Sequence, residues 1–169
     1  MTEIGKAAFA ACTNLSDITF QGEHTLLHGG AFGARTSYSV GTFAGQLSAL
    51  YNDWLYDDSA SDFFIWNGQL LAYKGESKTP VIPDTVQTIG ADAFWRADIT
   101  GVTIPSSVKL IGAWRSMSAP PLTSVDIPAR VERIDNNAVP ATATGMTSVK
   151  LNKGLKVMRR GRLATTVMG

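Results

Sequence analysis

The sequence predicts a repeat solenoid that is rich in β-strand. A short apolar pattern, I-P-x-x-V-x-x-I, begins at Ile82 and recurs at Ile104 and again at Ile127. A second pattern, L-x-x-L-x-L, ends at Ile104 and again at Ile127, which are also the first residues of the later copies. A fixed period of about 23 residues is typical of solenoids, in which each repeat buries its apolar face only against its neighbours. The hydrophobic content of 44% is enough for a continuous core.

The L-x-x-L-x-L segments predict the strands of the parallel sheet. Copies end at Phe20, Ile104, Ile127 and Leu151 in the sequence, and their last apolar positions alternate as a strand with one buried face requires. Proline follows two of them, at Pro105 and Pro128, and ends the strand because it lacks an N–H group. The outward positions of these strands then form a polar strip of Thr19, Thr103, Asp126 and Lys150, flanked by Asp17, Ser124 and Ser148.

The chain reads as one continuous domain with three stretches. Residues 1–62 are interpreted as degenerate repeats, because steps of 23 connect apolar residues: Ile4 with Leu27 and Leu50, Phe9 with Phe32 and Leu55, and Phe20 with Phe43 and Trp66. Of these, Phe32, Phe43, Leu50 and Leu55 are expected to be buried in phase with Phe9 and Phe20. Residues 63–80 predict an inserted β-hairpin, with Asn67-Gly68 at its turn, and a polar connection. Residues 81–169 are the regular repeats.

The combined motif I-P-x-x-V-x-x-I-G-x-x-A-F, followed by L-x-x-L-x-L, resembles the BspA-like leucine-rich repeats, also called the Treponema pallidum type. The agreement is best over residues 4–20, 81–104 and 104–127. The resemblance implies a leucine-rich-repeat-like, right-handed solenoid with a parallel sheet on its concave face and one inserted β-hairpin. It also implies surface proteins of bacteria and some protists that act in adhesion and host contact, and it implies no catalytic residues.

Composition and motifs argue against several classes of function. The net charge of +1 gives no general attraction to nucleic acid or to anionic membranes, and no run approaches the roughly 20 apolar residues of a membrane span. The single cysteine excludes an intrachain disulfide. No acid–base pair or metal-ligand motif stands out, so we expect no enzyme activity and no cofactor.

Two charged runs are candidate contact patches. The acidic run, with no Lys or Arg among its members, consists of Asp53, Asp57, Asp58 and Asp62; the basic run, with no acidic residue among its members, consists of Lys150, Lys153, Lys156, Arg159, Arg160 and Arg162. The acidic loop could also wrap calcium, although it lacks the Gly and the terminal Glu of an EF-hand. Nearby, Tyr51, Trp54 and Tyr56 could stack against a sugar, while the phase of Leu50 and Leu55 suggests that some of these rings pack inside.

These observations favour a non-enzymatic module for protein binding or adhesion that uses the polar strip. The alternative is a structural subunit of a larger particle, such as a phage virion or a surface layer. No capping repeat is recognisable, so a partner or neighbouring subunit is expected to cover one or both ends of an oligomer. The third hypothesis is a carbohydrate-binding surface protein. The expected location is the cell surface or the outside, with the export signal beyond this sequence, or else a virion.

Overall fold

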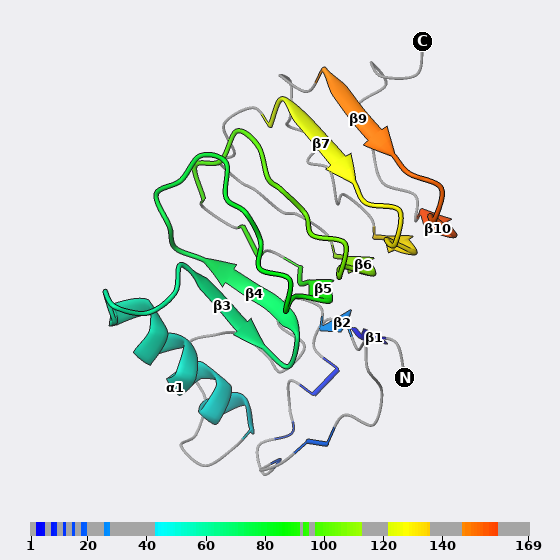
Figure 1. Cartoon of the computed structure of the whole chain (residues 1–169). Helices are drawn as coiled ribbons and strands as arrows, with labels where there is room; N and C mark the ends of the chain where they lie inside the picture. The colour runs from blue at the N-terminus through cyan, green and yellow to red at the C-terminus, as the bar shows by residue number, and fades with distance from the viewer. Residues whose placement is uncertain are drawn as a thin grey trace.

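The computed structural model in Figure 1 describes residues 3–5, 8–9, 12, 15, 18–19, 26–27, 43–91, 93–94, 97–112, 122–135 and 147–158. These residues contain a single helix and a series of short strands. The elements are β1 (Glu3–Ile4), β2 (Leu26–Leu27), α1 (Phe43–Tyr56), β3 (Phe63–Trp66), β4 (Gln69–Tyr73), β5 (Thr88–Ile89), β6 (Leu110–Ile111), β7 (Ser124–Ile127), β8 (Arg133–Ile134), β9 (Ser148–Leu151) and β10 (Val157–Met158).

A six-stranded sheet holds most of the described chain together. Its order is β10-β8-β6-β5-β4-β3, and every neighbouring pair except β3–β4 is parallel. Ile89 lies beside Ile111, Ile111 beside Ile134, and Ile134 beside Met158. Residues that pair across these strands therefore occupy equivalent positions of successive repeats, and the repeat period predicted from the sequence is confirmed as the spacing of the sheet.

The L-x-x-L-x-L segments form parallel strands, as predicted, but these strands lie outside the six-stranded sheet. Those segments form a second, separate ladder, in which β7 pairs with β9 and an isolated bridge joins Val81 to Thr103. The six-stranded sheet instead uses the residues that follow each P-x-x-V turn, as where Val108 N donates to Pro105 O at 3.2 Å. The strands β5, β6, β8 and β10 are each only two residues long, too short to show the alternation by which a strand is recognised in a sequence.

The apolar side chains of both ladders meet in one core. Three valines one repeat apart, Val86, Val108 and Val131, are completely buried. Two columns of isoleucine run beside them: Ile89, Ile111 and Ile134 from the six-stranded sheet, and Ile82, Ile104 and Ile127 from the second ladder. Full burial of one such side chain contributes roughly 1.5–3 kcal/mol, so the stacked columns are the main source of stability.

The expected steps of 23 in the N-terminal half hold only in part. Ile4 and Leu27 are parallel partners in β1–β2, as predicted. Residues 43–56 form the helix α1 in place of a repeat, and the expected burial is wrong for Leu50, which is 50% exposed, while Leu55 is partly buried; Phe20 and Phe32 lie outside the described residues. A helix forms here because Tyr51, Trp54 and Leu55 share one face at helical spacing, and this face packs against β3 and β4.

The strands β3 and β4 are an antiparallel pair joined at Asn67-Gly68, as the sequence predicts for these two residues. Both turn residues have positive φ, at 47° and 69°, which suits the tight turn between twisted strands. One face of the pair packs on the main core through Phe63 and Ile65, and the other packs on α1 through Phe64. Because β4 also pairs with β5, this antiparallel pair begins the parallel array.

The polar connection after β4 belongs to the second ladder. Lys78 O accepts a hydrogen bond from Thr100 N at 2.7 Å, and Pro80 O accepts one from Thr103 N at 3.0 Å. These carbonyls lie one repeat before their donors, so residues 78–82 serve as the first rung of that ladder. No observation tests the division at residues 62 and 80, which stays a prediction.

Truncation of a buried isoleucine should be costly. Ile111 is 2% exposed between two well-formed repeats, so Ile111→Ala is expected to lower the free energy of unfolding by about 2–5 kcal/mol, as measured by urea denaturation. Thr103→Ala is the control on an outward position and should change it by no more than roughly 0.5 kcal/mol. Equal losses for the two variants would contradict the assignment of inward and outward positions.

A methyl group at Gly112 should also destabilise the stack. A Cβ atom there would lie 2.8 Å from Ala91 N and 3.0 Å from Ile89 O, and these backbone atoms cannot move cheaply. We expect Gly112→Ala to cost about 1–3 kcal/mol in urea denaturation. At Gly101 the nearest atom to a new Cβ is Thr79 Cγ2 at 3.4 Å, so Gly101→Ala is the matched control and should fall within roughly 1 kcal/mol of the wild type.

Candidate functional site

The second ladder brings most of the predicted polar strip together. Ser124 lies beside Ser148 and Asp126 beside Lys150 in the β7–β9 register, and all four side chains are exposed. Thr103 is exposed and lies one repeat before Asp126 in the same ladder. Thr19 is exposed, but no described strand pairing joins its segment to this ladder, and Asp17 lies outside the described residues.

The charges on the strip neutralise one another. Asp126 Oδ2 lies 3.0 Å from Lys150 Nζ, and Asp126 Oδ1 accepts a hydrogen bond from Asn152 Nδ2 at 3.0 Å. Both charged side chains are mostly exposed, so this ion pair contributes only about 0–1 kcal/mol to stability. The strip therefore presents hydroxyl groups around an internally paired charge, which suits a broad polar contact.

A column of threonines beside the strip was not singled out from the sequence. The side-chain hydroxyl of each threonine donates to a carbonyl one repeat earlier: Thr100 to Lys78 O at 3.4 Å, Thr123 to Thr100 O at 3.4 Å, and Thr147 to Thr123 O at 3.2 Å. The available signal was the recurrence of Thr at steps of 23 and 24. These bonds fix the backbone next to Ser124 and Ser148 and thereby position the strip.

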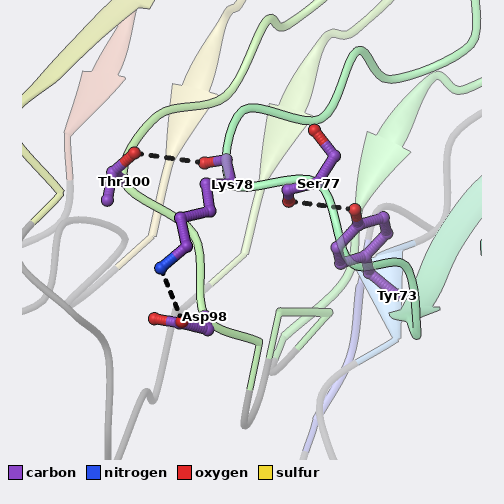
Figure 2. A network of polar contacts seen from close by, with 5 residues as sticks. All are labelled: Tyr73, Ser77, Lys78, Asp98 and Thr100. Carbon is purple, nitrogen blue, oxygen red and sulfur yellow. Dashed lines mark hydrogen bonds and ion pairs between the residues drawn. The ribbon is translucent and has the colours of Figure 1, made fainter.

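The start of this ladder is held by a polar network around the connection after β4. Figure 2 shows Tyr73 Oη donating to Ser77 O, at 3.1 Å, and Thr100 reaching Lys78 O. The side chain of Lys78 turns toward the next repeat, where its Nζ lies 3.0 Å from Asp98 Oδ2. The network ties residues 77–78 to the repeat that carries Thr103.

The acidic patch is exposed, but a lysine that is distant in sequence enters it. Asp53, Asp57, Asp58 and Asp62 are all exposed. Hydrogen bonds from Ser59 to the carboxylate lower the pKa of Asp57, and Lys74 adds a smaller effect. The Nζ of Lys74 donates to Trp54 O and Asp57 O, each at 2.6 Å, and so binds the carbonyl end of α1.

Within the part of the chain that the structure describes, no group of three or more His, Cys, Asp or Glu residues is arranged to hold a metal ion. In the acidic loop, Asp57 Oδ1 accepts hydrogen bonds from Ser59 N at 2.9 Å and from Ser59 Oγ at 2.6 Å.

The aromatic residues of α1 do not form an open platform. Trp54 is 9% exposed, and its ring centroid lies 5.4 Å from that of Phe64 and 5.5 Å from that of Tyr51. Lys74 Nζ lies over the same indole, 4.9 Å from its centroid. Tyr56, at 81% exposure, is left as the freely accessible ring of the three. The interpretation that some of these rings pack inside is confirmed.

The basic patch lies on the last described repeat. Lys150, Lys153 and Lys156 are exposed, and Lys156 Nζ lies 3.1 Å from Glu132 Oε2 of the repeat before it. Arg159, Arg160 and Arg162 lie outside the described residues. The lysines project from β9 and from the turn between β9 and β10.

The repeat geometry agrees with a comparison against protein families. The model of the BspA type leucine rich repeat region, in six copies, matches residues 1–68 and 69–166. The chain belongs to this family. Curated proteins and solved structures gave no match. In this BspA-type chain the V-x-x-I part of the C-terminal repeats forms the strands β5, β6 and β8 of the six-stranded sheet, and the L-x-x-L-x-L part carries the exposed strip. The described residues include no helix with the length and hydrophobicity needed to cross a membrane.

The stability of this BspA-type array should depend on the ionisation of Tyr73. Burial raises the pKa of the Tyr73 phenol above its usual 10.0, and the Asp62 carboxylate raises it further. The neutral phenol therefore contributes its full stabilisation of the fold below pH 10. This stabilisation is lost as the pH rises through the higher pKa of Tyr73 in the folded state. We expect the free energy of unfolding to fall less steeply above pH 10 in Tyr73→Phe than in the wild type.

The measurement is urea denaturation at a series of pH values from neutral to strongly alkaline. Tyr56→Phe is the matched control because that ring is 81% exposed, and it should keep the slope of the wild type. Identical slopes for all three proteins would show that the Tyr73 phenol is not held in its neutral form by the fold.

Proposed function

We propose that this chain is a non-enzymatic module that binds another protein, in adhesion, through the polar strip of the second ladder. The observation that carries the proposal is the register of β7 and β9, which sets small hydroxyl side chains and one internally paired charge side by side on an exposed surface. Membership of the BspA-type family supports a role in protein binding.

A protein is a better partner for this strip than a small molecule or a nucleic acid. Ser124, Asp126, Ser148 and Lys150 are exposed on successive strands and do not converge on a common point. The net charge of +1 provides no general attraction to phosphates. The role we infer needs no cofactor and no turnover of a substrate.

The proposed architecture is one right-handed solenoid, in which the β3–β4 pair is an inserted hairpin and a parallel ladder lines the concave face. The near-constant interval between paired positions, from Ile89 to Ile111 and on to Ile134, supports it. Parallel strands joined by a crossover are right-handed in about 98% of cases, which supports the handedness. The proposed location is the cell surface or the outside of the cell; a virion is the alternative.

Long charged side chains placed on the strip should abolish adhesion and leave the fold intact. We expect Ser124→Arg with Ser148→Arg to lose attachment of beads coated with the purified chain to host cells, because two long cations would block a close contact with the strip. Thr85→Arg with Ser106→Arg is the matched control, since these side chains are exposed at the turns before the six-stranded sheet. Equal attachment of both variants, each with wild-type thermal stability, would refute the role of the strip.

A second candidate function is that of a structural subunit in a larger assembly, such as a virion or a surface layer. It is favoured by the last described repeat, where Leu151, Val157 and Met158 are 40–48% exposed although the equivalent residues of earlier repeats are largely covered. In a solenoid, an exposed apolar face of this kind is normally covered by the next repeat, by a capping unit or by another chain.

A further inference from the structure

The large apolar side chains that remain exposed are concentrated at two places. Among the described residues they are Leu50, Tyr56, Val81, Leu151, Val157 and Met158. Leu50 and Tyr56 lie on α1, and the last three lie on β9 and β10. All but Val81 therefore belong to the helix or to the last repeat.

These two places lie at opposite edges of the six-stranded sheet. The sheet runs from β3 at one edge to β10 at the other, and α1 packs on β3 through the contact of Trp54 with Phe64. Figure 1 shows α1 on one side of the parallel strands and β9 and β10 on the opposite side. The two apolar surfaces of one molecule cannot meet each other, so a contact between them requires two molecules.

The two ends also carry opposite charge. Leu50, Asp53 and Tyr56 share one helix face at steps of three, and residues 51–62 contain four Asp and no Lys or Arg. Residues 147–158, which form the last described repeat, contain three Lys and no Asp or Glu. Asp126 and Glu132 of the repeat before pair with Lys150 and Lys156, and the exposed Lys153 adds a further positive charge to this end.

We propose that the partner at these ends is a second copy of this chain, which docks head to tail. The basic end of one molecule, formed by Leu151, Lys153, Lys156, Val157 and Met158, covers the acidic end of the next, formed by Leu50, Asp53, Tyr56 and Asp58. Apolar side chains meet at the centre and opposite charges meet around them, the usual arrangement of a specific interface. This inference rests on the second candidate function, and it leaves the polar strip free.

A head-to-tail contact has a distinct consequence for assembly. The two surfaces differ, so each bound molecule presents a fresh end to the next, and the contact yields an open filament unless the rotation between neighbours closes a ring. A protein that assembles in this way would display its polar strips in a regular array, which gives many weak contacts a combined avidity.

The test is sedimentation velocity of the full chain over a range of concentrations and salt. We expect the weight-average mass to rise with concentration at 0.1 M salt and to fall toward the monomer at 1 M, as the screening length drops from about 10 Å to about 3 Å. Asp53→Lys with Asp58→Lys should leave both ends positive and abolish association; Lys153→Glu with Lys156→Glu should leave both ends negative and do the same.

An equimolar mixture of the two charge-reversed proteins should recover association, since every end again meets an opposite charge. Recovery cannot come from misfolded protein. The matched controls are Asp84→Lys and Arg130→Glu, residues of the middle repeats, which should associate like the wild type. Should the basic-end variant fail to fold, Tyr56→Ser with Leu50→Ser tests the same contact from the other side and should also remain monomeric.

Monomeric wild type at the highest soluble concentration would overturn the proposal, and so would association that survives reversal of charge at either end. Neither result would bear on the strip, because adhesion by Ser124→Arg with Ser148→Arg is measured independently. A monomer that still adheres through the strip would leave the adhesion module standing without self-assembly.

Discussion

Main-chain hydrogen bonds between equivalent residues of successive repeats set the geometry on which the rest of the molecule depends. Gln87 O accepts from Lys109 N, Lys109 O from Glu132 N, and Glu132 O from Lys156 N, each at 2.9 Å. Every repeat must return its backbone to this position before the next repeat can pair with it. Residues that are in register across successive repeats point their side chains in the same direction, and the buried apolar columns form for this reason.

Successive repeats approach so closely that one position leaves little space for a side chain. The sequence accommodates this in two ways. Gly90 and Gly112 occupy one column, and a side chain at either would meet backbone of the preceding repeat within 3.0 Å. Asp135 takes the same position one repeat later and is 5% exposed. Burial of a carboxylate is unfavourable unless a cation accompanies it, and Arg133 Nη2 lies 3.0 Å from Asp135 Oδ1. At Asp135 the column therefore accommodates a buried carboxylate beside the guanidinium of Arg133.

The surface of the molecule divides according to the same stacking. Interior repeats cover each other's apolar faces and expose only what points away from both ladders, so Thr103, Ser124 and Asp126 form a polar strip. Among the described residues, no further strand extends the six-stranded sheet beyond β3 or β10. One end is closed by α1, whose covered face binds Phe64 and whose outer face shows Tyr56. The other shows Val157 and Met158.

The sequence by itself determined the family, the period and the identity of the buried columns, because stacked repeats make each contact recur at a fixed separation along the chain. It also placed the turn at Asn67-Gly68 and the outward positions of β7 and β9, which follow from local turn chemistry and from alternation. Only the tertiary structure decided that the main sheet follows the P-x-x-V turns, since strands as short as β5 and β6 leave no periodic signal.

The tertiary structure also decided that residues 43–56 form a helix. Steps of 23 assign this stretch to a decayed repeat, whereas the spacing of Tyr51, Trp54 and Leu55 fits one face of a helix. The packing of Trp54 against Phe64 favours the helix. The contacts of Lys74 likewise could not be predicted from the sequence. It lies far from Trp54 along the chain, and only the pairing of β3 with β4 carries its ammonium group to the end of α1 and into the acidic patch.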